Sequence, residues 1–423
     1  MTTPATTDGL ILLIGSGGRD YREYLLAGAA ARRPLWLLDA AEPTWQRPHL
    51  AGATVVPLLD PERLVPDVEG LVKAAAAVAA DHPVAGVFSY DETLVTATAE
   101  VAAALGLPGL GVEGADNCRD KHRTRRLLTE AGLLQPRFAH VGTLAEAQAA
   151  AGEFGYPVVL KPRGMGASIG VVRATGAAEL AAAFAVAEGA GQGGNPAYRG
   201  GVLVEEFLDG PEISIDGAVH QGRYTPFFLA HKQVGAAPYF EETGHTVSAD
   251  EPLLADPELT GMLAAAHRAL GLRDGITHTE VKLTARGPAI VEVNGRLGGD
   301  LIPYLGKLAT GLDPARIAVD VAAGREPELA HRSTATVGIR FAYPPQDGVV
   351  REVLLPVAGQ LPGLRAAAAI AGPGTLLRLP PRGYIARHAY VIAEAADRAG
   401  CLAALDAAEG AVGLRLDPAE PQE

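Results

Sequence analysis

Short apolar runs alternate with amphipathic stretches along the first hundred residues. Leu10–Gly15, Leu35–Leu38 and Val84–Ser89 have the length and apolar character of buried strands. Between the first two, Arg19–Arg33 has the pattern of a helix. A strand, a glycine turn, a helix and a second strand predict the opening of a parallel α/β layer. The turn, Ser16–Gly18, is only a partial glycine fingerprint for a dinucleotide, so a sharp turn is the simpler interpretation.

Longer helical segments follow the first domain boundary, which we place near residue 113. Asp116–Gly132 has the spacing of one helix, with Asp116 or Asn117 as its cap. A strand at Phe138–Val141 comes next. An alanine-rich helix then runs to Gly155.

Thr277–Asp300 has the pattern of a β-hairpin. The sequence THTEVKL is a run with β-branched residues at alternate places, ARGP is turn material, and AIVEVN is a second run. In the second run Val291 and Val293 face one way. Glu292 and Asn294 face the other way. Three polar residues share a face of the first run: His278, Glu280 and Lys282.

This hairpin brings oxygen ligands together. Glu280, Glu292 and Asn294 supply two carboxylates and an amide oxygen, a hard site that suits Mg²⁺. A shared face requires an even sum of paired residue numbers, and hence an odd loop or a bulge around Ala285–Pro288. The alternative is a solvated outer face of an edge hairpin.

Pro157–Val172 is a second informative stretch. A strand runs into Lys161, a loop rich in glycine follows, and then another strand begins. The N–H groups of such a loop can face phosphate oxygens. It is not a P-loop, because the Gly-Lys-Ser/Thr ending is absent and a strand follows. A glycine-rich turn without a ligand is the alternative.

Val202–Ile215 places acidic residues at the end of an apolar strand. Glu205 and Glu206 at this position are costly to bury unless something binds there. The backbone of Glu206 and Leu208 could read an adenine edge. Glu212, on the next strand, could accept hydrogen bonds from ribose hydroxyls.

Composition narrows the setting. The 423 residues carry a net charge of −13 and no basic run, which argues against a nucleic-acid partner. Two cysteines form neither a disulfide framework nor a metal cluster, so we expect a reducing, cytoplasmic setting. No apolar stretch is long enough to span a membrane, and the start MTTPATTDG lacks the features of a signal peptide.

These motifs together resemble the ATP-grasp superfamily of carboxylate–amine ligases. The resemblance rests on Lys121, Lys161 with its glycine loop, the sequence EEFLDGPE from Glu205 to Glu212, Glu280, and EVNGR from Glu292. It covers roughly residues 1 to 325. Within the superfamily, THTEVKL and EVNGRLGGD are similar to L-amino-acid ligases of the bacilysin type, which make dipeptides.

The resemblance implies an α/β fold, with α+β character in a glycine-loop lid. It implies a Rossmann-like parallel domain over 1–113, an ATP-grasp domain over 114–325 with its lid at about 135–204, and a small C-terminal α/β domain over 326–423.

The resemblance also implies roles for individual residues. The two lysines contact the ATP phosphates, and the loop closes over them; Lys161 is also a catalytic residue. The implied ATP-binding set is Lys121, Lys161, Gly164, Gly166, Ser168, Glu205, Glu206, Phe207, Leu208 and Glu212. Two Mg²⁺ ions, with Mn²⁺ as a second candidate, are held by Glu280, Glu292 and Asn294. Arg296 is the catalytic residue that steadies the acyl phosphate.

The substrate residues form a less specific set. We expect Phe227–Asp250 to be a loop-rich wall of the substrate site. Glu92 has an alternative role as a helix N-terminal residue. His231 and His278 have an alternative role as structural groups. The candidate residues are Glu92, His231, Lys232, His278, Arg296, Gly298, Gly299 and Asp300.

The expected reaction activates an amino-acid carboxylate as an acyl phosphate and joins it to an amine, giving an amide or dipeptide, ADP and phosphate. A carboxylase or transformylase acting on another acid is the alternative, and a non-catalytic nucleotide-binding module is a third possibility. The expected partners are small molecules, and a homodimer is possible.

Overall fold

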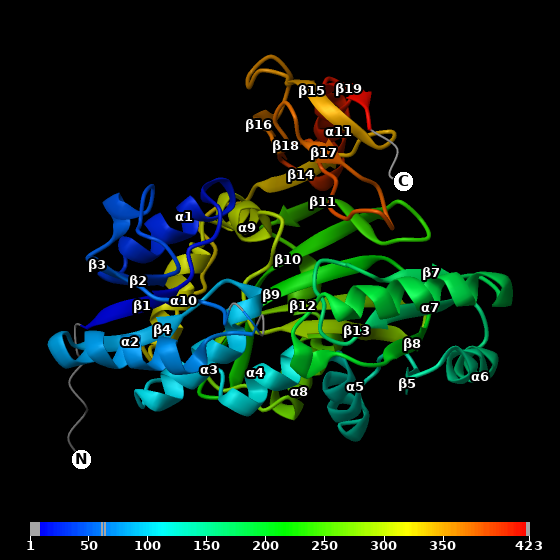
Figure 1. The fold of residues 1–423 in the computed structure, drawn as a ribbon. Helices are drawn as coiled ribbons and strands as arrows, with labels where there is room; N and C mark the ends of the chain where they lie inside the picture. Colours follow the sequence, from blue (N-terminus) through cyan, green and yellow to red (C-terminus); the bar gives the residue numbers. More distant parts are fainter. Residues whose placement is uncertain (1–8, 61, 63–64, 420–423) are drawn as a thin grey trace.

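The computed structural model describes residues 9–60, 62 and 65–419, so the amino-terminal end, where no signal peptide is expected, lies largely outside the described residues. The first unit is a parallel sheet in the order β3-β2-β1-β4 (Figure 1). Its strands are β1 (Leu10–Ile14), β2 (Leu35–Asp39), β3 (Gly52–Val55) and β4 (Val84–Phe88). Its helices are α1 (Arg19–Ala30), α2 (Val68–Asp81) and α3 (Val95–Ala104). The predicted parallel layer is confirmed.

The predicted single helix over Asp116–Gly132 is wrong. The segment forms α4 (Val112–Arg119) and α5 (Lys121–Glu130). Asp120 between them has an extended backbone, and its carboxylate accepts hydrogen bonds from the first N–H groups of α5. The same carboxylate binds Arg163, so a tertiary contact stabilises the break. As a result Lys121 becomes the first residue of a helix.

A second sheet, here called the lid sheet, has the order β5-β8-β6-β7. Its strands are β5 (Phe138–Val141), β6 (Val158–Pro162), β7 (Val172–Ala174) and β8 (Val202–Glu206). The helices α6 (Leu144–Phe154) and α7 (Ala177–Gln192) pack on it around an apolar core that includes Leu160, Leu180 and Val204 (Figure 1). A capping box at Thr143 and Glu146 starts α6.

The third and largest sheet is antiparallel, in the order β13-β12-β9-β10-β11-β14-β18-β16. Its first five strands are β9 (Glu212–His220), β10 (Arg223–Gly235), β11 (Glu241–Ser248), β12 (Gly275–Thr284) and β13 (Gly287–Asn294). The helices are α8 (Pro257–Ala269), α9 (Ile302–Thr310) and α10 (Pro314–Ala322). The segment 227–250, expected to be loop-rich, therefore consists mostly of strands β10 and β11.

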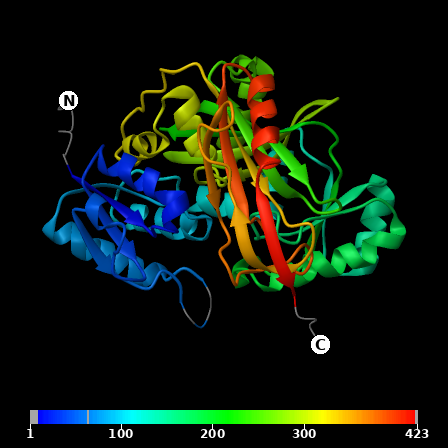
Figure 2. The same ribbon diagram turned by 90° about the horizontal axis from the view of Figure 1, so that it is seen from above.

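The C-terminal region continues this large sheet. Its strands in the sheet are β14 (Thr336–Ala342), β16 (Leu364–Ala369) and β18 (Ala389–Ala395), while β15 (Gly348–Leu354), β17 (Leu376–Leu377) and β19 (Gly413–Pro418) form a small sheet beside it. The helix α11 (Arg398–Glu409) packs on β14 and β18. Figure 2 shows these orange and red elements running across the green part of the molecule.

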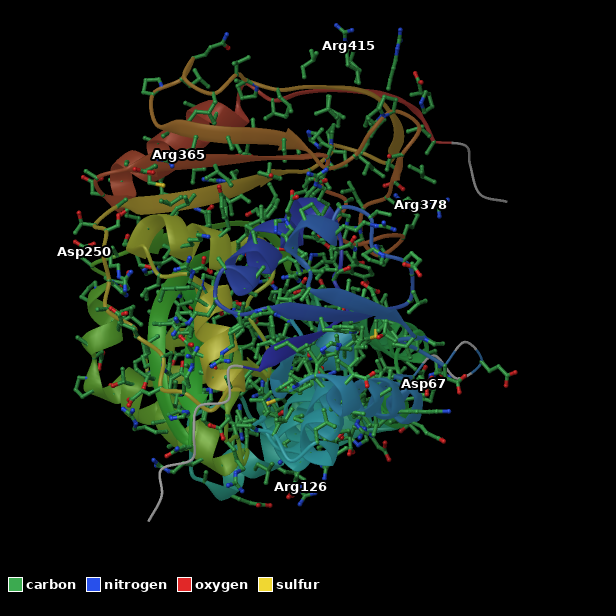
Figure 3. All side chains as sticks on the ribbon, turned by 90° about the vertical axis from the view of Figure 1, so that its left-hand side faces the viewer. Asp67, Arg126, Asp250, Arg365, Arg378 and Arg415 are labelled. Atoms are coloured by element: carbon green, nitrogen blue, oxygen red, sulfur yellow. The ribbon has the colours of Figure 1, made fainter. Side chains whose placement is uncertain are left out.

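Apolar side chains fill most of the interior, and many charged side chains lie at the surface. Arg126, Asp250, Arg365 and Arg415 are exposed at the edges of the molecule (Figure 3). Within the described part of the chain, no helix combines the length and the apolar character needed to cross a membrane.

Candidate active site

One pocket lies between the lid sheet and the large sheet. Its walls include the glycine loop after β6, the end of β8, and the polar faces of β10, β12 and β13. Most of the predicted site residues line this pocket. They are Lys121, Lys161, Gly166, Ser168, Glu205, Glu206, Phe207, Leu208, Glu212, Lys232, His278, Glu280, Glu292, Asn294, Arg296, Gly299 and Asp300.

The predicted hairpin geometry is confirmed, with the bulge in a different place. Glu280 pairs directly with Glu292, and His278 pairs with Asn294. Val281 then pairs with Ile290, so Val291 is the extra residue of a β-bulge. The bulge lies beside the carboxylates and not at the turn. It also turns Val291 toward the pocket, so the prediction that Val291 faces the same way as buried Val293 is wrong.

Lys232 lies among three carboxylates on neighbouring strands. Its Nζ is 2.8 Å from Glu212, 3.0 Å from Glu242 and 3.1 Å from Glu280. Burial would lower the pKa of Lys232, but these carboxylates raise it well above its usual value. Burial raises the pKa of Glu280; Lys232 opposes this shift, and the neighbouring carboxylates add to it. This part of the pocket thus holds more negative charge than a single lysine offsets.

Lys121 reaches the pocket from the start of α5. Its Nζ lies 2.8 Å from Oε1 of Glu292 and donates a hydrogen bond to the carbonyl of Met165 in the glycine loop. Burial would raise the pKa of Glu292, but Lys121 lowers it. Lys121 therefore contacts both the hairpin that carries the predicted metal ligands and the glycine loop.

Lys161 lies at the end of β6, and burial lowers its pKa. Its Nζ is 2.8 Å from Oε2 of Glu205, whose other oxygen lies 2.7 Å from Nε of Arg125. Burial would raise the pKa of Glu205, but Arg125 and Lys161 lower it to about 2. The Glu205 carboxylate thus binds two cationic side chains of the protein, and these are its observed partners.

The glycine loop presents only part of its length to the pocket. Gly166 and Ser168 line it, and Ser168 has a positive φ of 55°. Gly164 instead packs on Tyr198, because a Cβ at this position would lie 2.4 Å from the Cβ of Tyr198. Its carbonyl accepts a hydrogen bond from Arg119.

The end of β8 and the residues that follow it form the opposite wall of the pocket. The N–H of Glu206 donates to the carbonyl of Arg137, and the N–H of Phe207 donates to the carbonyl of Pro157. The Glu206 side chain points to Arg137 and Arg286, at 3.6 and 3.1 Å. Protein partners thus occupy both the N–H and the side chain of Glu206, and its contact with adenine stays a prediction.

Glu212 begins β9 and also lines this wall. Its carboxylate lies 2.8 Å from Lys232 and 3.2 Å from Lys282. Burial would raise the pKa of Glu212, but the two lysines lower it. A contact of Glu212 with ribose stays a prediction.

Arg296 follows β13 and is held by a carboxylate from the first unit. Its Nε lies 2.5 Å from Oε2 of Glu92, and its Nη1 donates to the carbonyl of Leu297 at 2.7 Å. Glu92 also pairs with Arg119. Burial would raise the pKa of Glu92, but the two arginines lower it to about 2. The predicted contact of Glu92 with a substrate amine stays untested, and its observed partners are arginines.

The two histidines have different surroundings. His278 lines the pocket, and its Nδ1 lies 2.5 Å from buried Asp216. Asp216 also accepts the N–H of Gly298, whose missing Cβ would lie 2.8 Å from the His278 ring. His231 faces the other way, with its Nε2 2.8 Å from Glu251, and does not line the pocket. A structural role therefore fits His231.

The pocket ends at Asp300, a predicted substrate residue, and at Arg387, which the motifs did not reveal. Both oxygens of Asp300 accept hydrogen bonds from Arg387 at 2.6 Å, and Arg387 also donates to Tyr343 and to the carbonyl of Glu242. Burial would raise the pKa of Asp300, but Arg387 lowers it. The C-terminal region thus supplies a wall of the pocket. No local signal predicts this pair, because its members lie 87 positions apart.

The predicted metal ligands form a suitable donor set. The carboxylates of Glu280 and Glu292 stand opposite each other, and Asn294 adds a buried amide on the same face. These are hard oxygen donors, and further carboxylates lie near Glu280, which fits Mg²⁺.

Known protein families match the chain over both parts of this pocket. Residues 340–417 match the family described as L-amino acid ligase C-terminal domain 2. Residues 154–304, which carry the lid sheet and the hairpin, match the ATP-grasp domain. The chain thus contains an ATP-grasp domain over residues 154–304. The assignment made from the motifs is therefore confirmed.

Individual relatives of the chain include named ligases. An alanine–anticapsin ligase of Bacillus subtilis (strain 168) is 31% identical over 274 residues, which are 60% of this chain and 56% of the relative. The chain thus spans little more than half the length of that ligase. A D-alanine–D-alanine ligase of Stutzerimonas stutzeri (strain A1501) is 29% identical over 226 residues, or 51% of this chain and 68% of the relative.

The solved structure of an L-amino acid ligase from Bacillus licheniformis superimposes with a TM-score of 0.77. The alignment covers 97% of this chain and 99% of that one, at 22% identity. The likeness shows that the ATP-grasp fold extends through the C-terminal region.

Proposed function

We propose that this protein is an ATP-dependent carboxylate–amine ligase that joins an amino acid to an amine, forming ADP and phosphate. The observation that carries the proposal is the convergence of Lys121, Lys161 and the Glu280–Glu292 pair in one pocket. Phosphoryl transfer needs positioning and charge neutralisation more than covalent catalysis, and these residues supply both.

Each group has a task in the proposed reaction. The loop at Gly166 and Ser168 covers the phosphates, while Lys121 and Lys161 offset their charge. The substrate carboxylate attacks the γ-phosphorus, ADP leaves, and the acyl phosphate forms. The amine then displaces phosphate and an amide results. Arg296, fixed by Glu92, faces the pocket where the negative charge of the acyl phosphate develops.

Glu280, Glu292 and Asn294 are the residues that would hold Mg²⁺, which neutralises phosphate charge and orients the terminal phosphates when bound. The chain's own lysines keep these carboxylates in place: Lys232 lies beside Glu280, and Lys121 lies beside Glu292.

The amino-acid substrate is supported by the names of the relatives and by the charged end of the pocket. The relatives include ligases of alanine with anticapsin and of D-alanine with D-alanine. Near Asp300 and Arg387 the pocket wall is polar and ionic. A polar amino acid suits such a wall better than an apolar acid does.

A panel of amino acids, given singly and in pairs with ATP and Mg²⁺, tests the proposal. We expect phosphate release in an amino-acid-dependent manner and a condensed product by mass spectrometry. Turnover with bicarbonate or formate and none with amino acids would favour the carboxylase or transformylase alternative. ATP binding without turnover for any acid would favour a binding module.

A further inference from the structure

Arg125 on α5 is the most completely bonded charged side chain of the pocket wall. It is only 1% exposed. Its guanidinium has five N–H groups, and five hydrogen bonds are observed. They go to both oxygens of Glu205 at 2.7 and 3.3 Å, to the carbonyls of Ile290 and Val291 at 3.2 and 2.7 Å, and to Gln135 at 3.2 Å. With all its donors used inside the protein, Arg125 has none left for a ligand.

The first group of these bonds stabilises the bulge in β13. A bulge removes a residue from the ladder, so its carbonyls need partners elsewhere. Arg125 supplies partners for the carbonyls of Ile290 and Val291. The bulge is what brings Glu292 opposite Glu280, because the pairing from Val281 onward has the other parity. The guanidinium thus holds the backbone that aligns the two carboxylates.

The second group of bonds orients the phosphate lysine. Arg125 binds both oxygens of Glu205 in a bidentate manner, and Oε2 of Glu205 lies 2.8 Å from Nζ of Lys161. A bidentate guanidinium fixes a carboxylate in direction as well as in place. Arg125 therefore fixes Lys161 through Glu205.

We propose that Arg125 is a positioning residue that holds both the Glu280–Glu292 pair and Lys161 in place. It joins α5 to the end of β8 in the lid sheet and to β13 in the large sheet. The proposal rests on the proposed function, since it assigns Arg125 a role in binding ATP and its metal.

The test measures binding of the fluorescent analogue TNP-ATP, once in EDTA and once with Mn²⁺. The dissociation constant in EDTA reports how well Lys161 is positioned. The dissociation constant in EDTA divided by that with Mn²⁺, here called the ratio, reports the contribution of the metal, and hence the position of the Glu280–Glu292 pair. In Arg125→Lys we expect the EDTA constant to rise at least tenfold and the ratio to fall at least tenfold, because lysine cannot bond five acceptors.

Two variants separate a specific role from general damage. Glu205→Gln should raise the EDTA constant while leaving the ratio unchanged, because the bulge keeps its partner. Arg340→Lys changes another arginine, which pairs with Asp406 and does not line the pocket, and should alter neither quantity. If Arg125→Lys does not fold by circular dichroism, the double variant Arg125→Met with Glu205→Met removes both buried charges. We expect this double variant to show the same rise in the EDTA constant and the same fall in the ratio as Arg125→Lys.

An Arg125 variant that folds and keeps the wild-type ratio would overturn the inference. The same conclusion follows if Glu205→Gln lowers the ratio as much as Arg125→Lys does. If the wild-type protein binds no TNP-ATP under either condition, the proposed function fails, and the inference fails with it. Metal-dependent binding by the wild type with an unchanged Arg125→Lys would leave the proposed function standing.

Discussion

Glu280 on β12 and Glu292 on β13 stand directly opposite each other, although the part of the hairpin between them and the turn pairs with the opposite parity. One extra residue, Val291, makes this alignment possible. The two carboxylates, with Asn294, therefore form one donor face toward the pocket that Lys121 and Lys161 also line.

Removing one carboxylate of this pair should nearly abolish turnover. We expect Glu292→Gln to keep less than a tenth of the wild-type kcat, a loss of at least about 1.4 kcal/mol in barrier stabilisation. Steady-state phosphate release at saturating ATP measures it. The matched change Glu251→Gln, at a carboxylate that pairs with His231 outside the pocket, should leave kcat within about threefold of wild type. A Glu292→Gln enzyme above a tenth of wild-type kcat would exclude Glu292 as a metal ligand.

Arg296 should not tolerate lysine. Its guanidinium contacts Glu92 and the carbonyl of Leu297 and still borders the pocket. A lysine has one charged centre and cannot contact both partners and a substrate oxygen. We expect Arg296→Lys to lower kcat/KM at least about 30-fold, roughly 2 kcal/mol. The control Arg286→Lys, at a half-exposed arginine that pairs with Glu206, should stay close to wild type. Equal effects of the two substitutions would contradict the role of Arg296.

Glu92 should make stability depend on pH in the acid range. Its pKa is lowered from 4.5 to about 2, so its carboxylate stabilises the folded protein above pH 4.5. That stability is lost as the pH falls from about 4.5 toward 2, and its full size is about 3 kcal/mol. Glu92→Gln cannot ionise, so the gap in unfolding free energy between the two proteins should shrink over this range. Urea unfolding at several pH values between 2.5 and 6 measures the gap. A gap that stays constant would show that the Arg119–Glu92–Arg296 contacts do not shift this pKa.

Much of the site could be predicted from the sequence, because the informative signals are local. Alternation along a strand shows that Glu292 and Asn294 share a face, and parity shows that a bulge or an odd loop must exist. The position of the bulge could not be predicted, because it depends on Arg125, which lies 165 and 166 positions from the carbonyls it binds.

Two other features lay beyond local patterns. The helix spacing of Asp116–Gly132 is continuous, and the break at Asp120 depends on Arg163, 43 positions away. The local pattern around Arg387 does not mark it as a pocket residue, and its role becomes visible only once β14 has paired with β11 and brought that segment to Asp300. In both cases the deciding partner is set by tertiary structure.

Transfer of the γ-phosphoryl group to a carboxylate is the central claim of this account, and an oxygen-18 experiment tests it most directly. An amino acid that supports turnover is labelled with ¹⁸O in its carboxylate and incubated with ATP, Mg²⁺, the amine substrate and the enzyme. If the carboxylate attacks the γ-phosphorus, one ¹⁸O atom per turnover appears in the released phosphate, and ADP is the nucleotide product. Label found in AMP, or phosphate released without label while the amide forms, would contradict the account.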